Sequence, residues 1–183
     1  MKVKTVFAIF CTLWLGRLSG KCPVFPLQAN FNPSLYTGVW YEALRALNLP
    51  FEKYDCTQAK YALLSNGRVS VLNSEYSLQV KVFSEAPGQA RFNGANGQVR
   101  FSIFQPWGDY RVVSTDYTSY SLIYSCSTFL WFKTEYAWIL TRQPQITQAR
   151  KKELFAILQQ KVPTLDFSNF YETKQGGECQ YKS

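Results

Sequence analysis

The chain of 183 residues contains no histidine. Histidine is the commonest metal ligand in proteins and the commonest general base near neutral pH. Cys-X-X-Cys pairs are missing as well, which disfavours a zinc site. We therefore expect no metal, no cofactor and no catalytic residue, although an enzyme that uses a Tyr or a Glu is an open alternative.

Concentrated positive charge is also missing. The formal net charge is +8, and the Lys and Arg residues are interspersed with acidic ones apart from Arg150-Lys151-Lys152. Recognition of nucleic acid would require a basic stripe or a known binding motif. We therefore expect no nucleic-acid partner.

No apolar run is long enough to span a bilayer, which needs about 20 residues. The longest, residues 6–15, follows Lys2 and Lys4 and precedes small residues. This order is typical of a secretory signal peptide, so we expect one at residues 1–20 and a single secreted domain over residues 21–183. An uncleaved membrane anchor is the alternative interpretation.

Loss of the signal peptide would remove three positive charges, which lowers the net charge from +8 to +5, and would also remove Cys11. Four cysteines then remain, namely Cys22, Cys56, Cys126 and Cys179. An even number of cysteines in a secreted chain indicates two disulfides. The spacing alone allows three pairings.

Short alternating runs rich in aromatic and β-branched residues dominate the chain after a lead-in in which Pro23, Pro26 and Pro33 argue against helix. They predict eight strands, near residues 38–47, 56–64, 67–73, 78–91, 97–105, 109–117, 119–126 and 135–142. Asn66-Gly67 is a strong hairpin signal between the second and third strands. Apolar residues at helical spacing then predict one amphipathic helix that ends before Pro163.

Eight antiparallel strands in succession leave two sheet edges to protect. Closing the sheet removes both edges and leaves an interior wide enough for side chains or one small ligand. We therefore predict an all-β fold, an eight-stranded antiparallel up-and-down β-barrel with the C-terminal helix packed outside.

Three motifs in order resemble the signature patches of the lipocalin family. They are Gly38-X-Trp40 at the start of the first strand, Thr115-Asp116-Tyr117 before the seventh, and Arg142 after the eighth. The resemblance runs from Lys21 to Cys179. It implies a cup-shaped barrel that carries a small hydrophobic ligand, with disulfides Cys22–Cys126 and Cys56–Cys179.

Closure of the barrel also gives these motifs a structural role. The start of the first strand would lie beside the end of the last, so that the Arg142 guanidinium meets the Trp40 indole in a cation–π contact. Gly38 would let the backbone pass closely, and Asp116 would accept hydrogen bonds from turn amides. We therefore expect a closed barrel floor at this end.

The ligand pocket is expected above this floor. In lipocalins the residues equivalent to Tyr61 and Trp138 line the cavity, and the alternation of the strands adds Leu44, Leu63 and Leu140. Bulges would change this alternation. The expected cargo is apolar, of the fatty acid, steroid, retinoid, bilin or carotenoid class, because each buried CH₂ contributes about 0.8 kcal/mol.

The loops at the open end are unusually apolar. Trp107 lies in the connection 105–108, and Phe129, Leu130 and Trp131 lie in the connection 127–134. Such a rim either covers the ligand or contacts a membrane or lipoprotein surface. A secreted carrier is therefore the main functional hypothesis. A lipocalin-type enzyme and a lipid-associating protein that acts through its rim are the alternatives.

Overall fold

A computed structural model describes residues 20–46 and 52–182 of the chain. Apart from Gly20, the expected signal peptide lies outside the described residues. The eight strands of the barrel are β1 Gly38–Ala46, β2 Asp55–Leu63, β3 Val69–Tyr76, β4 Phe83–Asn93, β5 Asn96–Arg100, β6 Gly108–Thr115, β7 Tyr120–Phe129 and β8 Phe132–Thr141.

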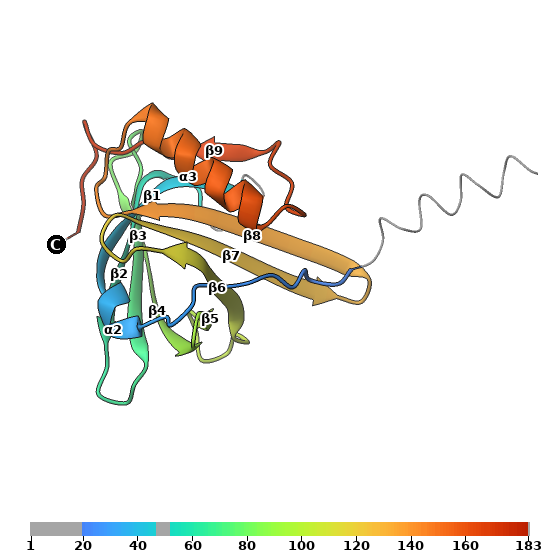
Figure 1. Cartoon of the computed structure of the whole chain (residues 1–183). Coiled ribbons are helices and arrows are strands. Elements are labelled where there is room, and N and C mark those ends of the chain that lie inside the picture. Colours follow the sequence, from blue (N-terminus) through green and yellow to red (C-terminus); the bar gives the residue numbers. More distant parts are fainter. Residues whose placement is uncertain (1–19, 47–51, 183) are drawn as a thin grey trace, which may run out of the picture.

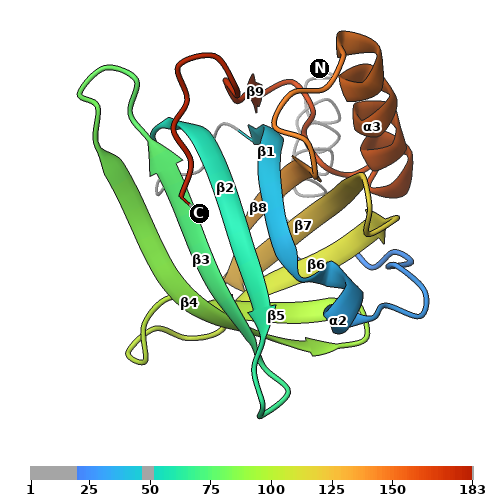
Figure 2. The ribbon, with the colours of Figure 1, turned by 90° about the vertical axis from the view of Figure 1, so that its left-hand side faces the viewer.

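Each strand pairs with the next in antiparallel orientation, and β1 pairs with both β2 and β8. The sheet therefore closes on itself as an eight-stranded barrel (Figures 1 and 2). Successive residues of a strand point to opposite faces of the sheet. One apolar cluster consequently lies on the inner face of the barrel, and a second lies on its outer wall. The predicted fold is confirmed.

Several strand boundaries differ from the prediction. A turn of residues 77–82 precedes β4, and β5 ends at Arg100 instead of continuing to residue 105. The predicted loop 127–134 is instead a continuation of β7 and β8, which meet in a two-residue turn of Leu130 and Trp131. The resulting hairpin projects well beyond the rest of the barrel (Figure 1).

The lead-in contains a helix that the prolines were expected to exclude. This short helix, α2 Pro33–Tyr36, begins with a proline at its first turn. Proline is tolerated there, because the N–H that it lacks would have no partner within the helix. The Asn32 side chain accepts a hydrogen bond from the Ser34 N–H and caps the helix. Tyr36 is thereby placed at the closed end of the barrel, within the interior cluster.

The second helix, α3 Gln148–Lys161, begins at Thr147, whose side chain accepts from the Arg150 N–H. Leu154 and Leu158 are fully buried in the outer cluster, where Ala137 and Ile139 of β8 also lie. The helix therefore packs outside the barrel, as Figure 2 shows.

After α3 the chain returns to the barrel. The short strand β9 Phe170–Glu172 pairs with the upper part of β1, where β1 no longer pairs with β2. The Gln175 side chain then donates hydrogen bonds to the backbone oxygens of Glu42 on β1 and Thr57 on β2. The C-terminal segment therefore fills the seam between these two strands.

Two disulfides join the chain ends to the barrel wall. They connect Cys22 with Cys126 and Cys56 with Cys179, as the family resemblance implied. The first fixes the lead-in beside β7, and the second fixes the C-terminal segment at the start of β2. All four cysteines among the described residues are thereby used.

Candidate functional site

The barrel is closed at the end where β1 begins. The Arg142 guanidinium lies 3.6 Å from the centroid of the fully buried Trp40 ring. It donates hydrogen bonds to the backbone oxygens of Val39 at 2.7 Å, Thr37 at 2.8 Å and Tyr117 at 2.9 Å. Three segments that are distant in sequence are thus held together by one side chain.

Gly38 is required by this arrangement. Its φ is +93°, a conformation that L side chains rarely adopt. A Cβ added to Gly38 would also lie 3.2 Å from a terminal nitrogen of Arg142. Both observations explain why glycine precedes Trp40 by two positions.

The turn between β6 and β7 lies at the same end. The Asp116 carboxylate accepts hydrogen bonds from the backbone N–H groups of Thr118, Ser119 and Tyr120. Partial burial acts to raise the pKa of Asp116. The Ser119 hydroxyl and the three N–H groups together outweigh burial and hold this pKa below its ordinary value. Asp116 therefore has a structural role in the turn.

At the level of the floor, four hydroxyl groups form a hydrogen-bonded chain. The Tyr110 hydroxyl contacts those of Tyr61 at 3.0 Å and Tyr36 at 3.1 Å, and Tyr36 contacts Ser121 at 2.9 Å. Burial raises the pKa of Tyr36 to about 12 and raises the pKa values of Tyr61 and Tyr110 as well. These phenols are therefore neutral hydrogen-bonding groups at physiological pH.

A charged group lies higher in the barrel, on β1. A bulge between Glu42 and Leu44 turns Arg45 to the same face as Trp138, its partner on β8. The Arg45 guanidinium donates to the Glu42 carboxylate at 2.6 Å, and both residues are buried. The Thr173 hydroxyl donates to the same carboxylate. A buried ion pair therefore forms part of the upper barrel wall.

Glu52 extends this group toward the open end. It accepts a hydrogen bond from the Trp138 indole N–H at 3.0 Å and shares one with the Glu42 carboxyl group. Burial, together with the neighbouring charge of Glu42, raises the pKa of Glu52 well above its ordinary value. A hydrogen bond between two carboxyl groups requires a proton, and the raised pKa of Glu52 favours its protonated form.

Of the five residues expected to line the pocket, three face the barrel interior and two do not. Leu140 and Trp138 of β8 belong to the interior cluster. Tyr61 also faces inward, but it lies opposite Gly38 at the level of the floor. Leu44 packs with the outer cluster because the bulge reverses its direction, and Leu63 is 48% exposed at the end of β2, below Tyr61. The expected roles of Leu44 and Leu63 were wrong.

An interior polar residue escaped the prediction. Asn73 on β3 has the same parity as Val69 and Val71, which belong to the interior cluster. Its amide oxygen is buried and has no hydrogen-bond partner within the described residues. A polar residue at an inward position of the alternating run 69–75 was the signal in the sequence.

The expected rim residues also separate. The guanidinium groups of Arg91 and Arg100 lie 4.4 Å and 4.5 Å from the centroid of the Trp107 ring. Phe129, Leu130 and Trp131 form the tip of the β7–β8 hairpin, together with Phe132. Each of these four side chains is between 62% and 75% exposed. The expected rim residues therefore belong to two separate surfaces. The surface around Trp107 is shared with arginines, and the hairpin tip is continuously apolar.

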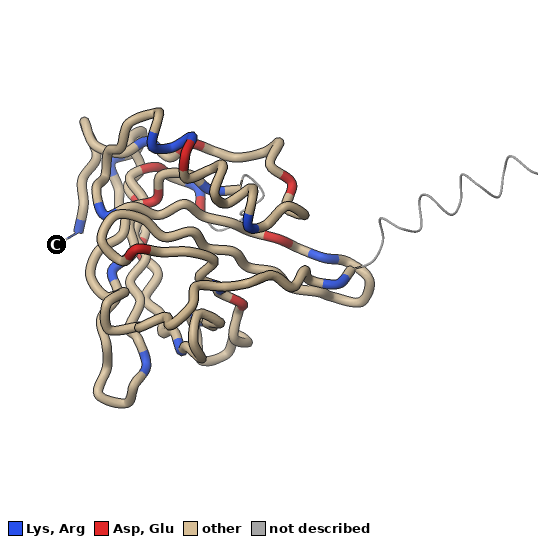
Figure 3. Tube along the Cα trace, in the orientation of Figure 1, with Lys and Arg blue, Asp and Glu red and all other residues tan. Residues whose placement is uncertain are grey.

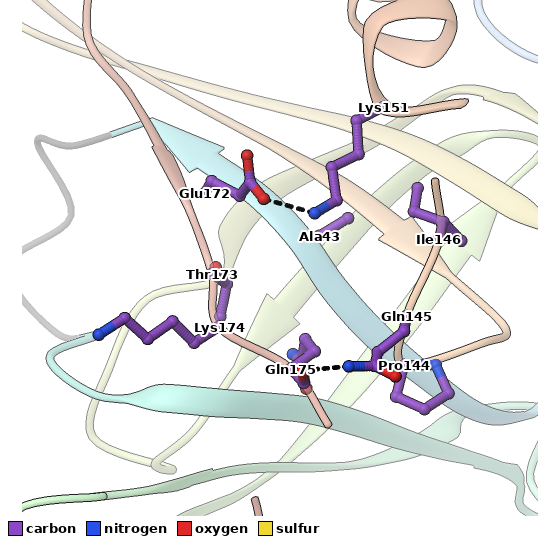
Figure 4. Close-up of a pocket in the computed structure, with 9 residues that line it drawn as sticks. All are labelled: Ala43, Pro144, Gln145, Ile146, Lys151, Glu172, Thr173, Lys174 and Gln175. Carbon is purple, nitrogen blue, oxygen red and sulfur yellow. Dashed lines mark hydrogen bonds and ion pairs between the residues drawn. The ribbon is translucent and has the colours of Figure 1, made fainter. Parts of the chain in front are cut away.

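Two pockets lie outside the barrel interior. The first, of about 240 Å³, lies between β1 and the segments that flank α3 and β9 (Figure 4). Its polar groups already pair with one another, Lys151 with Glu172 and the Gln145 side chain with the Gln175 backbone oxygen. The second, of about 300 Å³, is lined largely by polar residues that include Lys53, Asp55 and Lys174. Neither pocket suits an apolar ligand.

Within the described residues, no group of three or more His, Cys, Asp and Glu residues is arranged to hold a metal ion. No helix in this part of the chain combines the length and apolar character needed to cross a bilayer. Lys and Arg are spread along the chain without a continuous stripe (Figure 3).

Comparisons with known proteins place this geometry in a family. The model of the lipocalin-like domain matches residues 32–175. Apolipoprotein D of Rattus norvegicus is 40% identical over 132 residues, which cover 69% of each chain. The outer membrane lipoprotein Blc of Vibrio cholerae is 32% identical over 148 residues, which cover 79% of this chain and 84% of the relative.

Solved structures support the same fold. Lobster apocrustacyanin A1 and insecticyanin from the tobacco hornworm Manduca sexta each give a TM-score of 0.73 and match 88% of this chain. Their matched regions cover 92% and 90% of those chains, at 20% and 23% identity respectively. Together with the Trp40–Arg142 floor and the matched family domain, these similarities establish that the chain belongs to the lipocalin family and is similar to apolipoprotein D.

Proposed function

We propose that the protein is a secreted carrier that holds one small hydrophobic ligand inside the barrel. The observation that carries this proposal is a closed ring of eight strands, sealed at one end by Arg142 and Trp40, with an apolar inner face. Burial of a long apolar molecule in such a barrel provides enough free energy for micromolar binding after the cost of ordering the ligand.

A direct test identifies the cargo without assuming it. The protein is purified from a secreting host and extracted with organic solvent, and the extract is analysed by mass spectrometry. We expect an apolar compound at close to one molecule per protein. Candidate ligands of the fatty acid, steroid, retinoid, bilin and carotenoid classes are then ranked by quenching of tryptophan fluorescence.

Two single variants place the ligand within the barrel. Trp138 lies in the interior cluster, whereas Trp131 lies at the hairpin tip. Trp138→Phe is expected to remove most of the quenching, and Trp131→Phe is expected to retain it. Equal quenching in the two variants would contradict binding inside the barrel.

Secretion has its own test, because the name of the bacterial relative describes an outer-membrane lipoprotein. We expect the protein in the culture medium with Lys21 as its first residue, as determined by mass spectrometry. Protein that retains residues 1–20 and remains with the membranes would contradict this part of the proposal.

The hairpin tip favours a second candidate function, attachment to a lipid surface. Its four consecutive apolar side chains form a continuous exposed patch, and such patches usually mark an interface. Substitution of Phe129, Leu130 and Trp131 by Ser is expected to abolish flotation with phospholipid vesicles. The control is Ile103→Ser with Phe104→Ser, which changes apolar residues of another loop that are at least as exposed as those of the hairpin. Undiminished vesicle binding by the hairpin variant would contradict this function.

A further inference from the structure

We infer that the barrel selects cargo with an uncharged hydroxyl end and disfavours the matching carboxylate, through Asn73 in the wall and the group of Glu42, Arg45, Glu52 and Trp138 in the upper barrel. This inference rests on the proposed carrier function and specifies its ligand class. Two independent observations support it, the charge balance of the upper group and the unpaired amide of Asn73.

The charges in the upper barrel are already balanced. The positive charge of Arg45 is already paired with Glu42 at 2.6 Å, and the Arg45 guanidinium also lies 4.6 Å from the Tyr171 ring centroid on β9. Glu52 adds a second carboxyl group to the same site. A ligand carboxylate that entered here would lose its hydration without gaining a free cation, which is costly in a buried site.

The accessible side of the group suits a neutral oxygen. Glu42 and Arg45 are buried, whereas Glu52 and Trp138 are partly exposed. The Glu52 O–H is used toward Glu42 and one of its oxygens accepts from Trp138, so the carboxyl group keeps acceptor capacity for a ligand O–H but has no further donor for a carboxylate.

Asn73 provides the second observation. Its buried oxygen has no donor in the described part of the chain, and it lies opposite Ala59 of β2, a member of the interior cluster. A buried acceptor without a partner is unfavourable, so a ligand O–H at this position would remove that cost. A carboxylate has no proton to donate and leaves the cost in place.

Asn73 and Trp138 lie on β3 and β8, which are separated around the barrel by β1 and β2. The two polar positions therefore line different parts of the inner wall. An apolar alcohol meets favourable chemistry at either one, whereas an ionised acid does so at neither. Both polar positions therefore favour the same chemical class of cargo, and not only one orientation of it.

The test compares ligands that differ only at one end. Retinol and retinoic acid, and hexadecanol and hexadecanoic acid, are titrated against the full mature chain near neutral pH by tryptophan fluorescence. We expect each alcohol to bind at least about tenfold more tightly than its acid. Asn73→Leu, of similar volume, is expected to reduce the preference by about three- to tenfold, the value of one hydrogen bond. Asn93→Leu, at an exposed position of β4, is the control.

A second variant tests the charge argument. Glu42→Gln combined with Glu52→Gln keeps hydrogen-bonding atoms for Arg45, Thr173 and Trp138 but leaves the guanidinium without a carboxylate partner. Both changes are needed because Glu52 would otherwise ionise and pair with Arg45 once Glu42 is neutral. The acids are therefore expected to gain at least about tenfold in affinity. Preference of the wild-type chain for the acids, or an unchanged preference in both Asn73→Leu and the Glu42→Gln, Glu52→Gln double variant, would overturn the inference alone. Failure of all four probes to bind would overturn the carrier function and the inference with it.

Discussion

At the residue scale, Arg142 makes a cation–π contact and several backbone hydrogen bonds at the same time, which a lysine cannot do. Its planar guanidinium lies over Trp40 while its nitrogens reach three backbone oxygens in two other segments, at Thr37 and Val39 and at Tyr117. Lysine has a single charged nitrogen and lacks the flat face that covers an indole.

Arg142→Lys is therefore expected to lower the free energy of unfolding by about 2 kcal/mol, through loss of the cation–π contact and of hydrogen bonds. Urea denaturation measures the change. Arg100→Lys, which lies beside Trp107 on the wall, is the control and is expected to cost less than about 1 kcal/mol. Equal losses in the two variants would contradict the structural role of the floor.

Glu52 makes stability depend on pH in a defined direction. Its pKa is raised by burial and by Glu42, whereas the Trp138 N–H and Arg45 act in the opposite sense. Between the ordinary carboxyl pKa and this raised pKa, the folded chain holds a proton that the unfolded chain has released. The free energy of unfolding is therefore expected to fall as pH rises through that interval.

The measurement is urea denaturation from about pH 4 to about pH 9 for the wild-type chain and Glu52→Gln. The variant cannot ionise at this position, so its stability is expected to decline less with pH. The difference between the two curves isolates Glu52 from groups such as Asp116, whose lowered pKa acts at acidic pH. Parallel curves would contradict the assignment of the proton to Glu52.

The residues of the floor could be predicted from the sequence because their positions follow from closure alone. Once β1 and β8 are neighbours, Trp40 and Arg142 meet. The lining of the pocket could not be predicted as fully, because a single bulge after Glu42 turns Leu44 outward and Arg45 inward. The bulge arises where β1 pairs with both β8 and β9, and no local sequence signal marks it.

At the scale of elements, helix α3 contributes mainly through two leucines. Leu154 and Leu158 are fully buried against the outer wall of the barrel, in the cluster that contains Ile139. Leu154→Ala is expected to lower the free energy of unfolding by about 3 kcal/mol, because the rigid sheet below the helix cannot collapse into the cavity. Lys152→Ala on the exposed face is the control for thermal unfolding measurements. Comparable losses in both variants would contradict this packing.

The existence and order of the elements were predictable, whereas several ends were not. The residues 127–134 resemble a loop in composition, yet cross-strand pairing continues to Phe129 and Phe132. The lead-in prolines correctly indicated extended chain except at Pro33, where proline begins a helix. In both cases the outcome depended on pairing or capping partners that local propensity does not include.

At the scale of the whole molecule, the two disulfides restrict the conformations that the chain can adopt when it unfolds. They join residues separated by 104 and 123 positions. Each such link is expected to contribute about 4–5 kcal/mol by restricting the unfolded chain. Replacement of Cys56 and Cys179 by Ser is therefore expected to lower the urea midpoint strongly, and Cys22 with Cys126 comparably. No change on removal of either pair would contradict this.

The seam between β1 and β2 has a consequence for how far the protein can be shortened. The eight barrel strands end at Thr141, yet the wall beside Glu42 is completed by Thr173 and Gln175. Truncation of the chain directly after α3 would keep all eight barrel strands. It would nevertheless open the barrel wall between β1 and β2 and expose Glu42 and Arg45 to water. The shortest chain that keeps the barrel wall closed therefore extends 38 residues past Thr141, to Cys179.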